Sequence, residues 1–409
     1  MVPKGWERKP IKELCESIID CVNKTAKHVD YITPYKMIRT TNVRHGKVDT
    51  ENVRYVDEDV YQQWIRRGAP QDGDIIFTRE APVGEAGILE NSGGIFLGQR
   101  TMMYRVNPKV ANNRFVFYSL MSGYCQKQIE DLSNGGTVAH MRVPDCGEII
   151  INSPPFPEQQ KIAKILSTWD KAIGATERLI ENSTQQKKAL MQQLLTGKKR
   201  LLDESGKRFE SEWKERAVSS LGKIYSGGTP STSNTEYWDG DINWITPTDI
   251  TKQDSRYINS SLRKITLEGL KNSSAKLVPA GSLLICTRAT IGAMAITSHE
   301  MCTNQGFKNI VPNSKTNIEF VYYLLTYNKH RMISKASGST FLELSKTSFE
   351  SMKFRMPPLK EQQKIATVLT NADKEIELLE QQLADLQQEK KALMQVLLTG
   401  KKRVVVDEC

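Results

Sequence analysis

The chain has 409 residues, of which 25% are charged and 39% hydrophobic, and this size and composition are typical of a globular protein with two or three domains. Its net charge of +10 leaves two interpretations open, a basic protein without a polyanionic partner and a protein that binds nucleic acid. No apolar run approaches the ~20 residues of a membrane span, and the N-terminal "MVPKGWERKP" lacks the apolar core of a signal peptide, so we expect a cytoplasmic protein.

The first 153 residues predict a globular domain that mixes helices and strands. Short β-rich runs such as "GDIIFT" from Gly73 alternate with loops such as "NSGGIFLG" from Asn91, and "NRFVFYSLMSGYCQKQIEDL" from Asn113 predicts one helix. The domain holds 20 Lys and Arg against 19 Asp and Glu, so its net charge of +1 does not by itself predict nucleic-acid binding.

One stretch of this domain nevertheless has the composition of a DNA-contacting loop. "YKMIRTTNVRHGK", residues 35–47, places basic side chains among threonines and an asparagine. Arginine can donate to guanine edges, asparagine can pair with adenine, and threonine can contact phosphates or the thymine methyl group. The alternative is a polar strand and loop whose charges are solvated.

Residues 154–200 predict a long helix. Pro157 and Glu158 suit its first turn, and Gly197 suits the left-handed position after its end. Apolar residues recur in steps of three and four, as in a coiled-coil seam: Ile162, Leu166, Trp169, Ile173, Ile180, Leu190 and Leu194. Thr176, Ser183 and Lys187 interrupt this seam. About forty helical residues would extend roughly 60 Å.

Residues 201–356 predict a second mixed domain, which is more basic. Between residues 213 and 356 there are 18 Lys and Arg against 11 Asp and Glu, a net charge of +7. The stretch "INWITPTDITK" from Ile242 matches the place of the DNA-contacting stretch in the first domain and offers Thr246, Thr248 and Lys252. "SGGTPSTSN" from Ser226 predicts a loop.

Residues 357–409 repeat the long helix. "KKALMQVLLTGKKR" from Lys390 agrees with "KKALMQQLLTGKKR" from Lys187 at thirteen of fourteen positions, and the two segments align without a gap from their Pro-Pro pairs to their final arginines. The globular domains resemble each other more weakly, as in "GDIIFTREAPVG" and "GSLLICTRATIG". The chain is therefore a duplicated two-domain protein.

Matching seams predict that the two helices pair. The second seam is broken only by Lys390. The approximate two-fold axis of a duplication favours an antiparallel coiled coil with one domain at each end. The alternative is two amphipathic helices that pack on separate cores.

Motifs of catalysis are missing from the sequence. It contains no GxxxxGK[ST] phosphate loop, no GxSxG elbow, no CxxC pair and no HExxH motif. "NSPPFP" resembles the Pro-Pro box of amino-methyltransferases, but Ser153 stands where that box has Asn or Asp, and we interpret the prolines as the start of the helix. A non-catalytic protein is expected; the alternatives are a stand-alone DNA methyltransferase or nuclease and a coiled-coil scaffold that does not bind DNA.

Two variable domains alternate with two near-identical helices, and each helix opens with "PP…EQQKIA" and closes with "LLTGKKR". The domains carry "SGGTPS" and "GD/GS…TR…G". In these features the chain resembles the DNA-specificity subunit of type I restriction–modification systems. The resemblance covers essentially the whole chain. It implies an α+β protein with target recognition domain 1 at 1–153, a helix at 154–200, target recognition domain 2 at 201–356 and a helix at 357–409.

The resemblance also implies a function. Each domain would read one half of a bipartite, asymmetric target in double-stranded DNA, while the helix pair sets the spacer. Two methyltransferase subunits and a motor–endonuclease subunit would be partners, and no cofactor is expected on this chain, because S-adenosylmethionine, ATP and Mg²⁺ would bind only to those partners. We expect "LLTGKKR" to help form two docking surfaces; the alternative is that its leucines, Leu194, Leu195, Leu397 and Leu398, only close the helix pair.

DNA contacts carried over by the resemblance fall on loops of both domains. They are Lys36, Arg39, Thr40, Asn42, Arg44, Lys47, Arg79, Gln99, Arg100, Gly227, Gly228, Thr229, Thr246, Thr248, Arg288 and Lys308. The first domain lacks "SGGTPS" and has Glu80-Ala81-Pro82 where the second has Ala289-Thr290, so the two half-sites should differ.

Overall fold

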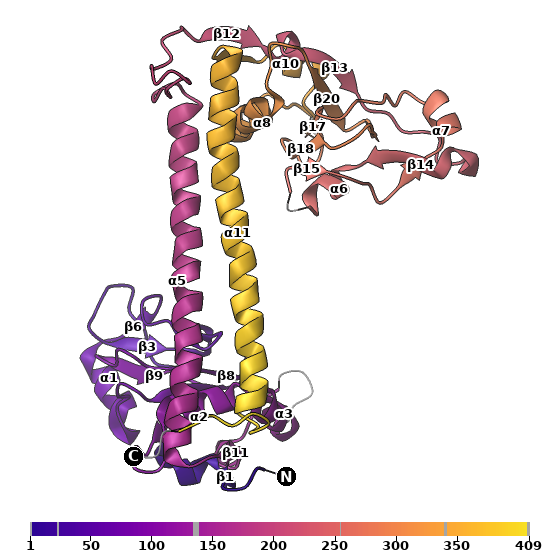
Figure 1. The fold of residues 1–409 in the computed structure, drawn as a ribbon. Coiled ribbons are helices and arrows are strands. Elements are labelled where there is room, and N and C mark those ends of the chain that lie inside the picture. Colours follow the sequence, from indigo (N-terminus) through magenta and orange to yellow (C-terminus); the bar gives the residue numbers. More distant parts are fainter. Residues whose placement is uncertain (1, 23, 134–138, 254, 339–341, 407–409) are drawn as a thin grey trace. The chain divides into compact units, whose positions relative to one another are not determined.

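The computed structural model describes residues 2–22, 24–133, 139–253, 255–338 and 342–406, which belong to two compact units (Figure 1). Unit 1 contains the described residues of 1–178 and 381–409, and unit 2 contains those of 179–380. Each unit combines one globular part with segments of both long helices, α5 (Phe156–Leu194) and α11 (Leu359–Leu397). Among the described residues, no helix is both long enough and apolar enough to cross a membrane.

A four-stranded antiparallel sheet in the order β2-β10-β7-β8 forms the centre of the globular part of unit 1. Its strands are β2 (Cys15–Asp20), β10 (Thr101–Val106), β7 (Ile75–Arg79) and β8 (Val83–Ile88). Strand β7 is buried on both faces, because Ile75 and Phe77 lie in one apolar cluster and Ile76 lies in another. Burial on both faces explains why the sequence of this strand is continuously apolar rather than alternating.

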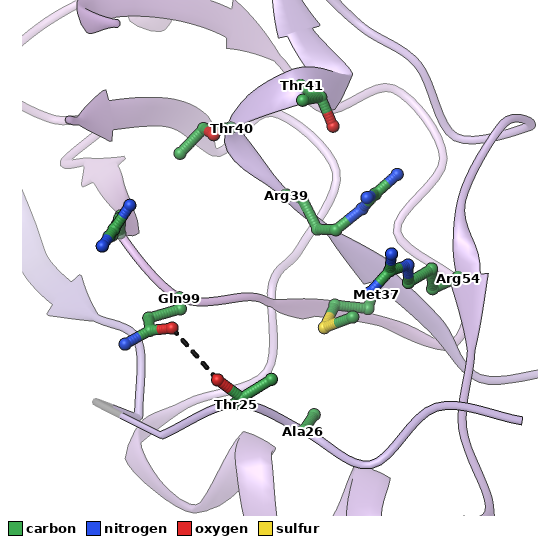
Figure 2. Close-up of a pocket in the computed structure, with 9 residues that line it drawn as sticks. Thr25, Ala26, Met37, Arg39, Thr40, Thr41, Arg54 and Gln99 are labelled. Carbon is green, nitrogen blue, oxygen red and sulfur yellow. Dashed lines mark hydrogen bonds between the residues drawn. The ribbon is translucent and has the colours of Figure 1, made fainter. Parts of the chain in front are cut away.

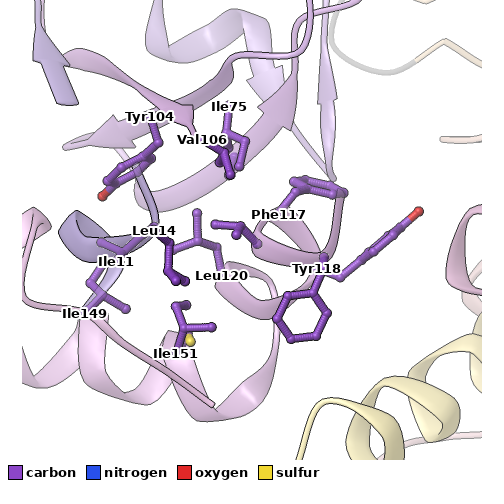
Figure 3. Close-up of a cluster of buried hydrophobic side chains, with 14 of the residues drawn as sticks. Ile11, Leu14, Ile75, Tyr104, Val106, Phe117, Tyr118, Leu120, Ile149 and Ile151 are labelled. Atoms are coloured by element: carbon purple, nitrogen blue, oxygen red, sulfur yellow. The ribbon is translucent and has the colours of Figure 1, made fainter. Parts of the chain in front are cut away.

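Helices α2 (Asn113–Leu120) and α3 (Gly123–Leu132) contribute to the larger of these clusters, which also contains Leu14 and Tyr104 (Figure 3). The sequence predicted one continuous helix here, and this prediction is wrong. Ser122 interrupts the helix because its hydroxyl accepts the backbone N–H of Cys125 at 3.3 Å and so begins a new helix.

The other face of the sheet carries a three-stranded sheet in the order β6-β3-β9. Its strands are β6 (Arg54–Tyr55), β3 (Lys36–Ile38) and β9 (Ile95–Leu97). The remaining elements of this part are β1 (Glu7–Pro10), η1 (Ile11–Leu14), η2 (Thr40–Asn42), β4 (Val43–Arg44), β5 (Lys47–Val48), α1 (Glu58–Trp64), η3 (Ile65–Arg67), α4 (Val143–Cys146) and β11 (Ile150–Ser153).

Unit 2 has the same plan. Its central sheet has the order β13-β20-β17-β18-β15 and its smaller sheet the order β16-β14-β19, while β12 pairs with β21 as β1 pairs with β11. The strands are β12 (Lys214–Ala217), β13 (Gly222–Ser226), β14 (Trp238–Ile245), β15 (Tyr257–Ile258), β16 (Lys264–Ile265), β17 (Leu283–Cys286), β18 (Met294–Thr297), β19 (Cys302–Thr303), β20 (Phe307–Pro312) and β21 (Lys353–Met356). The helices are η4 (Val218–Ser220), η5 (Thr235–Tyr237), α6 (Pro247–Thr251), α7 (Leu267–Lys271), α8 (Ile318–Tyr327), α9 (Lys329–Ser334) and α10 (Lys346–Glu350).

The long helices pair in antiparallel fashion within each unit. In unit 1, Ile162 and Leu166 near the start of α5 share an apolar cluster with Leu397 at the end of α11. In unit 2, Leu369 near the start of α11 shares a cluster with Leu194 at the end of α5. The predicted antiparallel pairing is confirmed, and each helix end also packs on the globular core of its unit.

The lysines that interrupt the two seams form ion pairs. Lys390 pairs with Asp170 in unit 1, and Lys187 pairs with Asp373 in unit 2. Each lysine therefore reaches an aspartate of the opposite helix, where an antiparallel pair brings them together. A position that weakens an apolar seam thus supplies a charge pair that fixes the register of the helices.

The two Gly-Lys-Lys-Arg phrases end in arginines that clamp buried carboxylates. Arg200 donates to both carboxylate oxygens of Glu361, at 2.6 and 2.8 Å, and Trp213 Nε1 donates to the same group at 3.2 Å. Arg403 donates to Glu158 at 2.7 Å twice, joined by Trp6 Nε1 at 3.2 Å. Both glutamates lie in the "EQQ" motif at the start of the opposite helix.

These clamps explain much of the duplicated phrase. Gly197 and Gly400 end the helices with φ angles of +72° and +71°, as predicted, and so turn the chain back toward each glutamate. Leu194, Leu195, Leu397 and Leu398 are all buried. The leucines and the final arginine of each phrase therefore close the helix pair, which favours the alternative interpretation over docking through these side chains.

Candidate nucleic-acid interface

Several residues that the sequence singled out gather around one cavity of unit 1. The cavity has a volume of about 280 Å³ and is lined by Thr25, Ala26, Met37, Arg39, Thr40, Thr41, Arg54, Gln99 and Arg100. Figure 2 shows the guanidinium groups of Arg39 and Arg54 next to each other, near Met37. The cavity therefore combines donors of hydrogen bonds with an apolar floor.

Local backbone structure brings these residues together. Strand β3 ends before Arg39, whose backbone N–H donates to Asn42 Oδ1 at 3.1 Å and so turns the chain into η2. Directly after the neighbouring strand β9, Gly98 donates its N–H to the carbonyl of Ile38 at 2.7 Å, and a Cβ at Gly98 would lie 2.6 Å from that oxygen. Glycine is required for this close approach, which places Gln99 at the cavity.

The electrostatics of the cavity favour a hydrogen-bond acceptor. Burial and the neighbouring charge of Arg54 lower the pKa of Arg39 below its ordinary value. The Nε of Arg39 is buried without a hydrogen-bond partner among the described residues. In contrast, the guanidinium of Arg100 has a partner, since its Nε lies 3.1 Å from Glu80.

Other predicted residues of unit 1 make contacts within the unit. Asn42 is buried, and its Nδ2 donates to the carbonyl of Asn52 at 2.8 Å. Arg44 donates to the carbonyls of Thr40 and Val43. Lys47 pairs with Glu177 of α5 at 2.8 Å, Arg79 pairs with Asp20 at 3.0 Å, and Gln99 accepts the hydroxyl of Thr25 at 3.3 Å. Lys36 is half-buried at the start of β3.

The equivalent turn of unit 2 has different chemistry. Strand β14 pairs in parallel with β19 as β3 pairs with β9, so Thr246 stands in the place of Arg39 and Asp249 in the place of Asn42. Asp249 is buried and accepts the N–H of Thr246 at 2.8 Å and that of Leu262 at 2.8 Å. Thr248 is exposed on the first turn of α6.

The remaining predicted residues of unit 2 lie nearby, in several structural roles. A Cβ at Gly227 would lie 1.7 Å from the carbonyl oxygen of Asn304, and one at Gly228 would lie 2.3 Å from a backbone nitrogen, so close packing requires both glycines. The hydroxyl of Thr229 donates a hydrogen bond to Gln305, and Arg288 forms an ion pair with Glu343 at 2.7 Å. Lys308 is buried in β20, and burial lowers its pKa.

Sequence reasoning missed two arginines and two tryptophans. Arg54 lines the cavity of unit 1, and in unit 2 the guanidinium carbon of Arg263 lies 3.8 Å from the ring centre of Trp238 and 5.6 Å from that of Trp244. A faint signal exists, since "NVRYV" and "SLRKI" both place an arginine directly after one aliphatic residue and two positions before another. Arg54 and Arg263 are 209 positions apart, whereas the two helices repeat at an offset of 203, so the equivalence of the two arginines is not visible in the sequence.

Comparison with known proteins gives consistent results. Residues 3–183 and 210–388 match the family described as the type I restriction modification DNA specificity domain. The chain is 38% identical over 172 residues to the MjaIX specificity subunit of Methanocaldococcus jannaschii, and the matched region covers 42% of this chain and 40% of that protein. It is 28% identical to the putative MjaX specificity subunit of the same organism over 98% of this chain and 95% of the relative. The S subunit of a type I system from M. genitalium has a similar fold, with a TM-score of 0.59, 17% identity and 96% of each chain covered.

Proposed function

Because the chain belongs to the family of type I restriction–modification DNA specificity proteins, we propose that it reads a bipartite, asymmetric DNA target with one globular part for each half-site. As a specificity subunit it recognises DNA and is not itself an enzyme, so a stand-alone methyltransferase or nuclease is not favoured. The observation that carries the proposal is that the four-strand order of the first central sheet recurs in the second, which adds β15, while the equivalent turns carry different polar residues, Arg39 in one and Thr246 in the other.

The different turns support two different half-sites. In unit 1 the cavity offers Arg39, Arg54 and Gln99, whose donors match acceptor edges of purines. In unit 2 the hydroxyl of Thr246 donates to Asp249 and is therefore occupied. The exposed donor of this part is Arg263, which stacks on tryptophan. Equal folds with unequal donor sets are what an asymmetric target requires.

We propose that the helix pair sets the spacer between the half-sites. Both long helices have 39 residues and contribute to both units. Two half-sites of a few base pairs bind weakly alone, but a stiff link makes the second contact intramolecular, at an effective concentration on the order of mM. Such a link also rejects half-sites at a wrong separation.

A matched pair of insertions tests the spacer. Seven residues inserted within 168–188 of α5 and seven at the matching place within 371–391 of α11 preserve the seam and lengthen each helix by about 10 Å. We expect the preferred gap to grow by about three base pairs, at ~3.4 Å per base pair, with both half-sites unchanged. Altered half-sites with an unaltered gap would contradict the proposal.

Partners follow from the family. A specificity subunit works with DNA and with the methyltransferase and restriction subunits of its system, and we propose two methyltransferase subunits here, one for each unit. Repeated exposed residues support this number. Lys188 and Lys391, and Gln192 and Gln395, lie on the helices, and Lys199 and Lys402 lie just after the helix ends. S-adenosylmethionine, ATP and Mg²⁺ would be bound by the partners.

Stoichiometry tests this arrangement. Changing Lys188 and Gln192 to Glu, while the second copy stays intact, should remove one methyltransferase subunit from the complex in a native mass measurement. The same changes at Lys391 and Gln395 serve as the matched variant. If both complexes keep two such subunits, the docking surface lies elsewhere.

The function itself is tested with purified components. The chain in complex with its methyltransferase subunits should select a split target with unlike halves from randomised DNA. The chain alone, given Mg²⁺ and S-adenosylmethionine, should neither methylate nor cut that DNA. Selection of one contiguous sequence, or modification by the chain alone, would reject the proposal.

A further inference from the structure

Two arginines occupy the same place in the smaller sheets of the two units. Strand β3 pairs with β6 so that Met37 faces Arg54. Strand β14 pairs with β16 so that Asn243 faces Lys264, and Trp244, one residue on, donates its N–H to the carbonyl of Arg263 at 3.4 Å. Since β3 and β14 also pair in parallel with β9 and β19 and lead into equivalent turns, Arg54 and Arg263 are topologically equivalent.

In unit 1 the arginine belongs to the cavity. Arg54 is exposed, and its guanidinium lies beside that of Arg39 (Figure 2). Met37 and Ala26 are buried and form the apolar floor. Among the described residues, neither guanidinium forms an ion pair, so two adjacent positive groups face the cavity without a carboxylate between them. Such a pair favours a ligand that supplies acceptors.

In unit 2 the arginine is held by aromatic rings. Trp238 and Trp244 are buried and meet edge to face, with ring centres 5.0 Å apart. The guanidinium of Arg263 lies over them while its side chain is exposed. Stacking fixes the plane of the guanidinium, and a fixed plane reduces the entropy lost when its donors bind a partner.

We propose that Arg54 and Arg263 are specificity-determining residues, each of which donates two hydrogen bonds to the acceptor edge of a guanine in its own half-site. This inference rests on the proposed function, in which each globular part reads one half-site. The fork of an arginine matches the O6 and N7 acceptors of guanine. An arginine can also fork onto a phosphate, but such a contact carries no sequence information. The tryptophans fix the plane of the Arg263 guanidinium, and Arg54 faces the buried Met37 across the strand pair.

The test uses the specificity subunit in complex with its methyltransferase subunits and a library of randomised DNA. Arg54→Gln should reduce discrimination for one G·C pair of the first half-site by roughly 5- to 150-fold, and leave the gap and the second half-site unchanged. Arg263→Gln should do the same to one G·C pair of the second half-site, so each variant is the control for the other. Arg54→Lys and Arg263→Lys keep the charge but lose the fork, and should lose most of the discrimination.

Arg66→Gln supplies a further control, because Arg66 is an exposed arginine of unit 1 whose Nε donates to the carbonyl of Gln63, outside the cavity. It should leave every position of the target unchanged. Thermal unfolding of each variant checks that the fold is retained, as expected for exposed side chains.

Three outcomes would overturn the inference. Uniform weakening over all sequences, whether or not lysine restores binding, would assign both arginines to phosphates. An unchanged target would remove them from the interface. If the unaltered complex selects no split target at all, the proposed function fails as well. If it selects a split target that the changes at Arg54 and Arg263 leave unaltered, only the inference about these arginines fails.

Discussion

The two globular parts are joined to the helix pair by different ion pairs, which reach different positions of the duplicated helix. In unit 1, Lys47 of β5, which lies beside β8, pairs with Glu177 of α5, and the two side chains are 71% and 40% exposed. In unit 2, Arg256 stands next to β15, which pairs with β18, and its side chain is 10% exposed. It lies 2.9 Å from Asp373 and 3.2 Å from Glu319.

The two ion pairs differ in how much they contribute to the stability of their units. An exposed lysine pair contributes about 0.2–1 kcal/mol and is screened by salt. Arg256 lies between two carboxylates and also donates to the hydroxyl of Tyr323. Its removal would leave the half-buried Glu319 without a cationic partner, whereas Asp373 would keep Lys187.

Both globular parts contact the long helices through buried apolar residues and through a tyrosine that donates to an aspartate, Tyr118 to Asp170 and Tyr323 to Asp373. The additional ion pair of unit 2 is shielded from water, whereas water and ions can replace that of unit 1.

The largest effect is expected from Arg256→Ala. It should destabilise unit 2 by about 3 kcal/mol, because the half-buried Glu319 loses its cationic partner and Asp373 keeps only Lys187. Denaturant unfolding measures the loss, and hydrogen exchange should show it in β15 and α8. Arg114→Ala is the control, since Arg114 forms an exposed pair with Glu90 in unit 1 and its loss should stay within about 0.5 kcal/mol. Equal losses in the two variants would contradict the difference between the units.

A smaller difference is expected between the two arginine clamps. Arg200→Ala should cost about 2–3 kcal/mol, because Glu361 is fully buried and loses two charged hydrogen bonds. Arg403→Ala should cost less, since the side chain of Arg403 is 44% exposed against 19% for Arg200 and water can partly replace it. Thermal unfolding of both variants, with Lys199→Ala and Lys402→Ala as exposed neighbours, measures the order; a larger loss for Arg403→Ala would refute it.

Lys308→Met makes unit 2 resemble unit 1. Lys308 faces Ile285 of β17, and Met102 faces Phe77 of β7 in the same register of the equivalent strands. Lys308 and Met102 therefore occupy equivalent positions, and unit 1 buries a methionine there. Burial lowers the pKa of Lys308 below 10.5, because the folded state disfavours the protonated amine. This costs free energy of unfolding in full below the lowered pKa. The cost disappears as pH rises toward 10.5, where the amine is neutral in both states.

The methionine variant should therefore be more stable at pH 7, by about 1 kcal/mol, and the gain should shrink toward pH 10.5. Denaturant unfolding of both proteins across this range measures it. A gain that does not change with pH would assign the effect to packing rather than to charge.

The smallest effect is expected from Lys47→Ala. Loss of the exposed pair with Glu177 should cost less than about 1 kcal/mol at low salt and nothing measurable at about 1 M salt, where the screening length is ~3 Å. The matched comparison is Arg256→Ala, whose effect should survive in high salt. A salt-independent loss for Lys47→Ala would mean that the link of unit 1 is as firm as that of unit 2.

The candidate interface was predictable only in part. The stretch from residue 35 to 47 does contain Arg39, which lines the cavity, but Asn42 and Asp249 turned out to be buried residues that shape the turn. The sequence could not separate these roles, because asparagine and aspartate are equally typical of turns and of binding loops. Arg54 and Arg263 were missed because they become equivalent only through strand pairing.

Sequence alone determined the features of this protein that depend on neighbours along the chain. The duplication, the seams of the long helices and the glycines at their ends follow from spacings of a few residues, since helical geometry repeats every 3.6 residues. Tertiary structure decided the rest. Arg403 meets Glu158 across 245 positions and Arg200 meets Glu361 across 161, and no local periodicity encodes such distances. Those pairs form because antiparallel packing brings the end of one helix to the start of the other, where burial makes an unpaired carboxylate too costly to leave alone.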